Sequence, residues 1–224
     1  MSLRLYPFRQ YSEFDVVNLF ASDTADSLPS TNGNGSAGVF VKVSAGNLDL
    51  DPITYAANSY LGNTDYPFLG ASQYPSVPLQ FTAATTGAPV LGMTLNQTLL
   101  TDENGEKLLY NPVKRAELQA VLSGQAVPVA TRGIFTLADT AIDWVDANMA
   151  PNAHLLISTN AGKVSGLAAS TATVNTGQYT FIGRVLGTGT RVSQNGKSDY
   201  FAGTGTAGAK YALVQFDCVN PAAI

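Results

Sequence analysis

Short runs of apolar and β-branched residues, separated by glycine, asparagine or proline, fill the chain from residue 124 onward. The runs are GQAVPVA, GIFTLA, HLLIST, GKVSG, QYTFIGRVLG and KYALVQF. Runs of this length between turn residues are typical of strands. Brief strands joined by tight turns are typical of antiparallel barrels and sandwiches. The pattern therefore predicts a mainly β protein with a small antiparallel β-barrel or sandwich in the C-terminal half, over residues 121–224.

One of these runs departs from simple alternation. In QYTFIGRVLG, apolar and polar side chains alternate as in a half-buried strand, but Ile182 breaks the alternation. A second subunit covering the other face of the strand would explain the departure.

The first twenty residues are rich in apolar side chains, but Pro7 and the mixed spacing fit neither a clean helix nor one long strand. Two interpretations stay open. One is an extended arm that docks on a neighbouring subunit and whose removal leaves a folded barrel; the other is an ordinary first strand packed on its own domain. A polar, glycine-rich tract from residue 22 predicts a mobile surface loop, so residues 1–38 are assigned to arm and loop. The candidate interface residues of the arm are Tyr6, Phe8, Arg9, Tyr11 and Phe14.

Residues 39–120 are predicted to form an extended, loop-rich β region. The run VFVKV, which begins it, predicts a strand. Residues 51–81 are rich in proline, which interrupts strand pairing, and in tyrosine, which suits contact surfaces. Tyr60, Tyr66 and Tyr74 are therefore candidate interface residues, although tyrosines that fill a small loop core would give the same pattern.

Turn and helix signals follow in the same region. Asn104-Gly105 lies between two apolar runs and predicts a hairpin, with strands near residues 95–100 and 107–110. The run PVKRAELQAVL predicts a short helix, because Pro112 suits a first helical turn. The run DTAIDWVDANM is a weaker helix candidate.

Composition and charge narrow the classes of partner. Charged residues make up only 12 % of the chain, about half of the usual share of roughly 25 %. The formal net charge is −4 and the 12 lysines and arginines are scattered singly, so we expect no direct nucleic-acid binding. No segment is long and apolar enough to cross a bilayer, so no membrane insertion is expected. The single cysteine, Cys218, cannot form an intrachain disulfide and is expected to be buried and unreactive.

Candidate catalytic groups are few. The one histidine, His154, begins an apolar run and has no nucleophile motif around it. The G-x-G-x-x-G of residues 203–208 leads into the strand-like KYALVQF instead of a helix, so it is not read as a dinucleotide-binding loop. Asp139, Asp143 and Asp146 could serve a glycosidase, but this spacing more often gives the solvated face of a helix. One His and one Cys cannot supply a zinc cluster. We expect no enzyme, no cofactor and no metal.

Four segments carry a resemblance to a known family: VLSGQAVPVATRGIFTLA (121–138), HLLISTNAGKVSG, FIGRVLG and the closing KYALVQFDC. In this order they resemble the small β-barrel capsid decoration proteins of tailed bacteriophages, also called head-stabilising or cement proteins. The opening LRLYPFRQYSEFDVVNLFA and the middle LNQTLLTDENGEKLLYNP resemble structural virion proteins of phages that infect marine cyanobacteria. The resemblance implies a decoration-type β-barrel domain over residues 121–224.

The resemblance also implies a function and partners. It implies a homotrimer on the outside of the capsid, assembled in the host cytoplasm, which bridges major capsid protein subunits and so stabilises the head. Two alternatives stay open. The chain is a structural part of the tail, neck or a fibre, or it binds glycans or a host surface through its tyrosine-rich segment. The tyrosines of that segment are Tyr55, Tyr60, Tyr66 and Tyr74.

Overall fold

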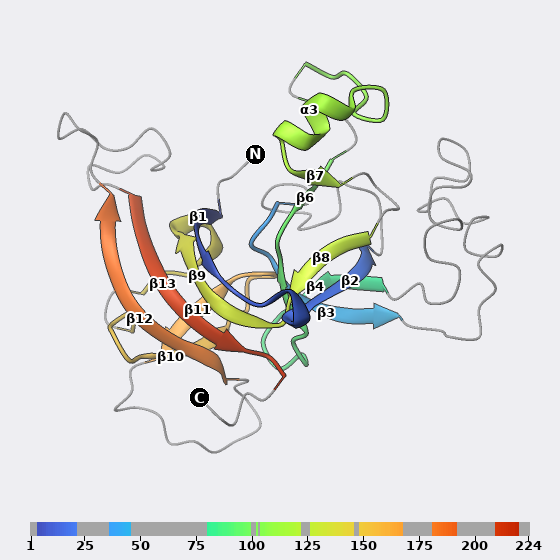
Figure 1. Ribbon diagram of the computed structural model, residues 1–224. Helices are drawn as coiled ribbons and strands as arrows, with labels where there is room; N and C mark the ends of the chain where they lie inside the picture. Colours follow the sequence, from blue (N-terminus) through green and yellow to red (C-terminus); the bar gives the residue numbers. More distant parts are fainter. Residues whose placement is uncertain are drawn as a thin grey trace.

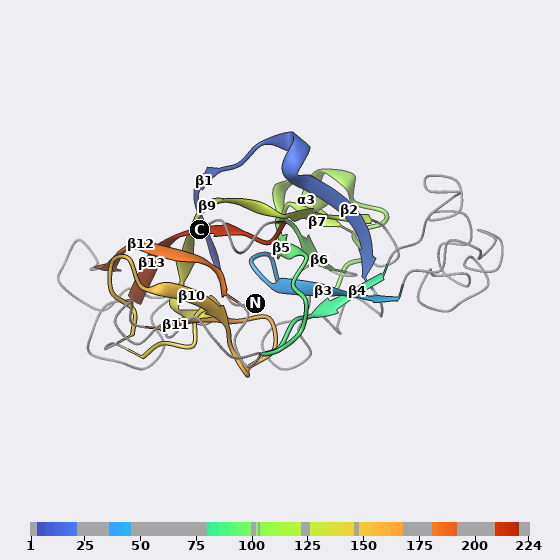
Figure 2. The same cartoon turned by 90° about the horizontal axis from the view of Figure 1, so that it is seen from below.

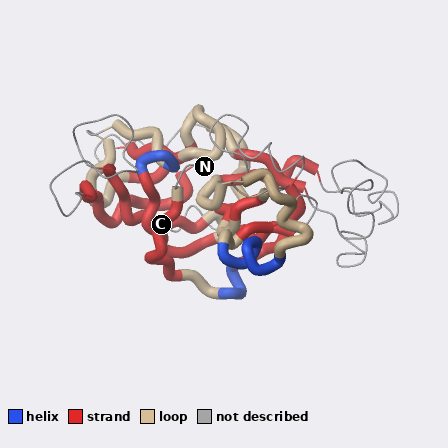
Figure 3. The backbone as a smooth tube through the Cα atoms, turned by 90° about the horizontal axis from the view of Figure 1, so that it is seen from above, coloured by secondary structure: helices blue, strands red, loops and turns tan. Residues whose placement is uncertain are grey.

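Strands dominate the fold (Figures 1 and 3). The structure is a computed structural model, and it describes residues 4–21, 36–45, 80–99, 102, 104–121, 126–145, 148–167, 181–191 and 209–219. Within these residues two sheets contain six and five strands, and there is one short α-helix. The prediction of a mainly β protein is thereby confirmed.

The larger sheet is antiparallel and lies on the left in Figure 1. Its strands are, in order across the sheet, β1 (Leu5–Gln10), β9 (Arg132–Ala138), β13 (Ala209–Asp217), β12 (Phe181–Arg191), β10 (His154–Ile157) and β11 (Val164–Leu167). Five of these strands come from the C-terminal half of the chain, as the sequence predicts. The sixth, β1, comes from the N-terminus and forms one edge, where it pairs with β9.

The smaller sheet lies beside the larger one in both Figures 1 and 2. Its strands are, in order, β2 (Val16–Ala21), β4 (Gln80–Ala83), β3 (Phe40–Ala45), β5 (Gly92–Thr94) and β8 (Ala126–Ala130). Since β8 also pairs with β2, the pairings return to the first strand. Only β2 and β4 run parallel, and they pair over two residues of each strand. The pairings of β3 with β5 and of β5 with β8 are equally short.

One apolar core joins the two sheets. Phe135, Leu155 and Phe216 of the larger sheet pack in one cluster with Phe40 and Met93 of the smaller sheet, and all five are fully buried. A second cluster lies within the smaller sheet and consists of Val39, Val41, Phe81, Val127 and Val129. Because successive side chains of a strand point to opposite faces, β3 can bury side chains in both clusters.

A β-bulge in β12 accounts for Ile182. Leu155 pairs with Gly183 and Leu156 with Phe181, so Ile182 is an additional residue without a partner on β10. A bulge of this kind interrupts the alternation of a strand. Ile182 and Val185 are therefore both buried in the core. The expectation that a second subunit explains Ile182 is wrong, because this side chain faces the interior of its own chain.

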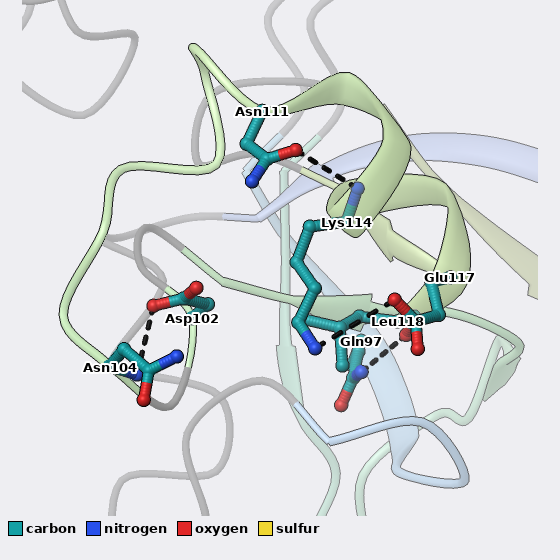
Figure 4. A network of polar contacts seen from close by, with 7 residues as sticks. All are labelled: Gln97, Asp102, Asn104, Asn111, Lys114, Glu117 and Leu118. Carbon is teal, nitrogen blue, oxygen red and sulfur yellow. Dashed lines mark hydrogen bonds and ion pairs between the residues drawn. The ribbon is translucent and has the colours of Figure 1, made fainter.

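The Asn104-Gly105 turn forms, but the strand predicted after it, near residues 107–110, does not form over that length. Asn104 N donates to Asp102 Oδ1 at 2.9 Å (Figure 4), and Gly105 has a φ of +84°, which favours glycine. Of residues 107–110, Lys107 is in a β-bridge and residues 108–110 form a turn and a bend; residues 100, 101 and 103 lie outside the described residues. The strand before the turn, β6 (Gln97–Thr98), pairs in parallel with β7 (Ala120–Val121) instead.

Helix α3 (Pro112–Glu117) confirms the predicted short helix. Asn111 Oδ1 accepts a hydrogen bond from Lys114 N at 3.3 Å, which satisfies a backbone donor of the first turn (Figure 4). Gln97 Nε2 donates to the Leu118 carbonyl at the C-terminal end of the helix. The helix is therefore tied at its far end to the strand β6.

Both sheets take strands from distant parts of the chain. β1 pairs with β9 and β2 pairs with β8, so the first twenty residues contribute to each sheet. Of the two interpretations of the N-terminus, the structure shows the strand packed on its own chain. The division into residues 1–38, 39–120 and 121–224 as separate units stays a prediction, but its boundaries do not separate the two sheets.

Candidate functional site

A single exposed aromatic side chain stands on the turn that joins the two sheets. This turn, residues 12–15, links β1 to β2 along one side of the molecule (Figure 2). Phe14 N donates to Ser12 Oγ at 3.3 Å and Asp15 N donates to the Ser12 carbonyl at 3.0 Å, which fixes a short 3₁₀ turn. The side chain of Phe14 is 99 % exposed. We call residues 12–15 the Phe14 turn.

The segment between β8 and β9 holds the Phe14 turn in place. The Asp15 carbonyl accepts hydrogen bonds from Thr131 N at 2.8 Å and from Thr131 Oγ1 at 3.0 Å. Arg132 Nε lies 3.0 Å from Asp15 Oδ2. The hydrogen bond and the charge of Asp15 raise the pKa of Arg132. These contacts attach the backbone of the turn to the body of the protein, and the Phe14 side chain projects from it into solvent.

Tyr11, just before the Phe14 turn, is the outer end of a row of aromatic rings. Its ring stacks on Phe135 with centroids 5.6 Å apart, and Phe135 stacks on Phe216 at 5.2 Å. Phe216 meets Phe40 edge to face at 5.2 Å. Stacked and edge-to-face pairs at these distances are favourable. Tyr11 is 42 % exposed, so it links the surface to the core.

An open groove with aromatic walls lies next to β1 on the larger sheet. It has a volume of about 300 Å³ and is lined by Tyr6, Pro7, Phe8, Thr136 and Tyr211. Tyr6 and Tyr211 meet edge to face with centroids 6.2 Å apart. On the sheet between them, β9 contributes the smaller Thr136. We call this feature the aromatic groove.

The neighbouring strand β12 makes room for one wall of the aromatic groove. A Cβ at Gly189 would lie 2.5 Å from the Tyr211 ring, so the ring lies across this glycine. Aromatic side chains commonly cover a glycine on the adjacent strand in this way. The ring of Tyr211 is therefore held flat against the sheet.

Arg9 lies on the edge strand β1, where it pairs with Phe135 on the face of the sheet opposite Thr136. Its Nε donates to the Tyr6 carbonyl at 3.4 Å, and burial lowers the pKa of its guanidinium. Pro7 and a register shift between Leu5 and Arg9 interrupt the free edge of the strand. Both features hinder the pairing of an additional strand, so a partner at this edge would contact side chains.

The structure places the candidate interface residues in three ways. Phe8, Tyr11 and Phe14 are exposed, at 52 %, 42 % and 99 %. Tyr6 is buried and Arg9 is partly exposed. The structure brings Tyr6 and Phe8 together in the aromatic groove. Tyr60, Tyr66 and Tyr74, together with Tyr55, lie outside the described residues.

Sequence reasoning missed Thr136 and Tyr211 as partners of β1. Both belong to strands that the sequence predicts, but the pairing of β1 with β9 joins residues far apart in the chain. The alternation in KYALVQF places Tyr211 on the face opposite Ala212 and Val214, which are buried. This alternation was a usable signal that Tyr211 lies on the outer face of the sheet.

The candidate acids do not form one helix face. Asp139 begins the short 3₁₀ turn η4 (Asp139–Ala141), so the predicted second helix is wrong. Asp143 Oδ2 accepts hydrogen bonds from Ser158 Oγ at 2.6 Å and from Asn160 Nδ2 at 3.0 Å. Asp143 thereby ties the segment after η4 to the turn between β10 and β11. Asp146 lies outside the described residues.

His154 lies at the start of β10, with its ring edge-on to Phe181 and centroids 5.0 Å apart. Within the described ranges, no group of three or more His, Cys, Asp or Glu side chains is placed to hold a metal ion. No helix in the same ranges has the length and apolar character needed to span a membrane. The glycines of residues 203–208 are not described, but the strand β13 follows them, as the sequence predicts.

No protein-family model, curated protein or solved structure matches this chain. The resemblance to capsid decoration proteins therefore stays a prediction that rests on the quoted segments.

Proposed function

We propose that the chain is a non-enzymatic structural protein of a phage virion, which binds the outside of the capsid and stabilises the head by bridging major capsid subunits. The observation that carries the proposal is the row of exposed aromatic side chains at Phe8, Tyr11 and Phe14 on one continuous segment. Aromatic residues are enriched at protein interfaces and often supply much of their binding energy. This segment is the proposed contact with neighbouring virion subunits.

The fixed position of the Phe14 turn supports binding. A turn whose backbone is already ordered loses less conformational freedom on association, so more of the contact energy becomes affinity. The two hydrogen bonds from Thr131 and the ion pair with Arg132 provide this order. Many identical weak contacts, summed over a capsid, would then stabilise the shell.

The fold and the charge agree with this role. In this proposal the decoration-type β-barrel or sandwich predicted for residues 121–224 corresponds to the larger sheet, completed by β1 and packed on the smaller sheet. The formal net charge of −4 and the low share of charged residues suit a protein that does not bind packaged DNA. The proposed location is the capsid surface of the virion.

Binding to purified heads that lack this protein tests the proposal. The full-length chain is expected to saturate heads at a copy number on the scale of the capsid lattice. The double variant Phe8→Ser/Phe14→Ser is expected to bind more than about tenfold more weakly, the scale of an interface hot spot. Tyr110→Ser is the matched control, because Tyr110 is also exposed, at 79 %, but lies next to α3.

Two results would contradict the proposal. If purified heads take up no wild-type protein, capsid binding is excluded. Binding at a few copies per particle, at the tail, neck or a vertex, would favour the tail, neck or fibre alternative instead.

A further inference from the structure

The Asn104-Gly105 turn has a chemistry that the proposed function does not use. Asn104 and Gly105 are both exposed, and no described atom outside the chain neighbours of Gly105 lies within 4 Å of a Cβ built there. The backbone nitrogen after an asparagine can attack its side-chain amide, and a glycine nitrogen is the least hindered because glycine has no Cβ. We propose that Asn104 is a site of spontaneous deamidation and that the hydrogen bonds of Asp102 set its rate.

The reaction needs only water as a second reactant. The Gly105 nitrogen forms a bond with Cγ of Asn104, the bond from Cγ to Nδ2 breaks, and Nδ2 leaves as ammonia with the proton of the Gly105 amide. The product of this step is a succinimide ring. Water then opens the ring at one of its two carbonyls, which gives aspartate or isoaspartate at position 104. Either product adds one negative charge to the turn.

Asp102 holds the attacking nitrogen back from this reaction. Gly105 N donates to the Asp102 carbonyl at 3.1 Å. Asp102 Oδ1 accepts hydrogen bonds from Asn104 N at 2.9 Å (Figure 4) and from Glu106 N at 2.8 Å. Asp102 N in turn donates to the Glu106 carbonyl at 2.9 Å. The Gly105 amide must leave this network before it can attack Asn104.

Opening of the turn is therefore the step that Asp102 controls. Its carboxylate is an ionised acceptor, and hydrogen bonds to such an acceptor are stronger than those between neutral groups. An exposed turn nevertheless opens locally at a small cost in free energy, well below that of global unfolding. Deamidation of Asn104 in the folded protein is thus expected to be slower than in the unfolded chain, but not abolished.

The modification changes the turn on the path from β6 to α3. Isoaspartate inserts a methylene group into the backbone at position 104, so the hydrogen bond between Gly105 N and the Asp102 carbonyl is disturbed. Aspartate keeps the backbone and places a second carboxylate near that of Asp102. The turn belongs to neither large sheet and to neither core cluster. The expected consequence is a local loss of order, with the thermal unfolding of the two sheets unchanged.

Peptide mapping of the full chain by mass spectrometry, after incubation in mildly alkaline buffer at body temperature, tests the proposal. Asparagine also precedes glycine at Asn32, Asn34 and Asn195, so the acid at position 104 is measured on its own peptide. The wild type is expected to convert more slowly when folded than when unfolded in urea. Asp102→Ala is expected to convert at least about fivefold faster than the folded wild type, which corresponds to about 1 kcal/mol of barrier.

Two further variants are controls. Asp102→Asn keeps a side-chain oxygen that accepts hydrogen bonds, so its rate is expected to stay close to that of the wild type. Asn104→Ser removes the site and should give no acid at this position. Thermal unfolding of each variant establishes that it is folded.

Either of two results would overturn the proposal. One is that the folded wild type forms no acid at position 104 under conditions in which the unfolded chain does. The other is that the folded wild type and the folded Asp102→Ala variant convert at the same rate. Both outcomes are independent of capsid binding, because the measurement uses the protein alone.

Discussion

Arg4 is the residue whose surroundings fit its chemistry least well. It is 1 % exposed, and its Nε and Nη2 donate to the Thr140 carbonyl at 3.4 and 3.3 Å. Its Nη1 is buried without a hydrogen-bond partner. Burial lowers the pKa of this guanidinium from 12.5 to about 10, which corresponds to about 3 kcal/mol against the charged form. A buried charge without a carboxylate is usually replaceable by an apolar side chain.

The first prediction follows from this cost. Arg4→Met is expected to raise the free energy of unfolding by about 1 kcal/mol or more, measured by chemical denaturation. Because the pKa is lowered in the folded state, the cost is fully present below pH 10 and is lost only as pH rises from about 10 to 12.5. The gain should therefore be constant between neutral pH and pH 9. Arg115→Met on α3 is the control and should leave the free energy of unfolding unchanged. If Arg4→Met lowers the free energy of unfolding while this control does not, Arg4 has a required partner.

Cys218 gives the second prediction at the residue scale. Burial first, and then the charge of Asp217, raises the pKa of this thiol from 9.0 to about 12. The unfolded chain loses this proton from about pH 9, whereas the folded chain keeps it, so the free energy of unfolding falls as pH rises from 9 to 12. At pH 10.5 the loss amounts to about 2 kcal/mol. Cys218→Ala should lack this loss, which chemical denaturation at pH 8 and 10.5 measures. If the free energy of unfolding changes equally between these pH values in both proteins, the loss does not come from Cys218.

At the scale of the element, β12 shows how one glycine permits a strand pair. A Cβ at Gly183 would lie 2.0 Å from the Gln215 carbonyl oxygen of β13. This atom belongs to the backbone of the neighbouring strand and cannot move aside without disturbing the ladder. Gly187, on the same strand, has no atom within 4 Å of such a Cβ. Of these two glycines, only Gly183 is required by close approach.

The third prediction uses this pair of glycines. Gly183→Ala is expected to lower the free energy of unfolding by more than about 2 kcal/mol, the scale of overpacking in a core. Gly187→Ala is expected to change it by less than about 0.5 kcal/mol, as at an unconstrained surface position. Thermal and chemical denaturation measure both. Similar effects of the two substitutions would mean that β12 and β13 do not approach as closely as described.

Local sequence signals predicted the elements much better than their partners. The runs that became β8, β9, β10, β11 and β13 were all visible as short strands, and Pro112 marked α3. The pairing of β1 with β9 and of β2 with β8 joins residues far apart in sequence, and no local pattern specifies it. The Asn104-Gly105 turn formed, but the described strand before it, β6, pairs with β7 after the helix, and no local pattern specifies that pairing. Ile182 was misread because a bulge shifts the alternation without any local mark.

In the candidate site, too, residue types were predicted from the sequence but their neighbours in space were not. Phe8, Tyr11 and Phe14 were identified by residue type and proved to be exposed. Tyr6 was chosen by the same reasoning but is buried in the wall of the aromatic groove. The groove itself depends on the order of strands β1, β9 and β13, so its other lining residues followed only from the topology.

For the whole molecule, the N-terminal segment is part of the fold. β1 completes the larger sheet and β2 pairs with two strands of the smaller one. The docking-arm hypothesis expects that removal of residues 1–20 leaves a folded barrel. The pairings predict the opposite, because truncation exposes the edges of both sheets and removes Leu5 from the core.

The fourth prediction is therefore that the chain lacking residues 1–20 loses cooperative thermal unfolding and aggregates. Circular dichroism and light scattering measure both effects. Phe8→Ser/Phe14→Ser in the full chain is the matched control and should unfold cooperatively, since both side chains are exposed. A truncated chain that unfolds with the wild-type transition would show that β1 and β2 are dispensable.

The most direct test of the central claim is cryo-electron microscopy of virions that contain this protein. The account predicts density for the two packed sheets at positions that repeat over the outside of the head, with the segment from Phe8 to Phe14 at contacts with neighbouring subunits. Density confined to the tail, the neck or a single vertex, with none on the head lattice, would contradict it.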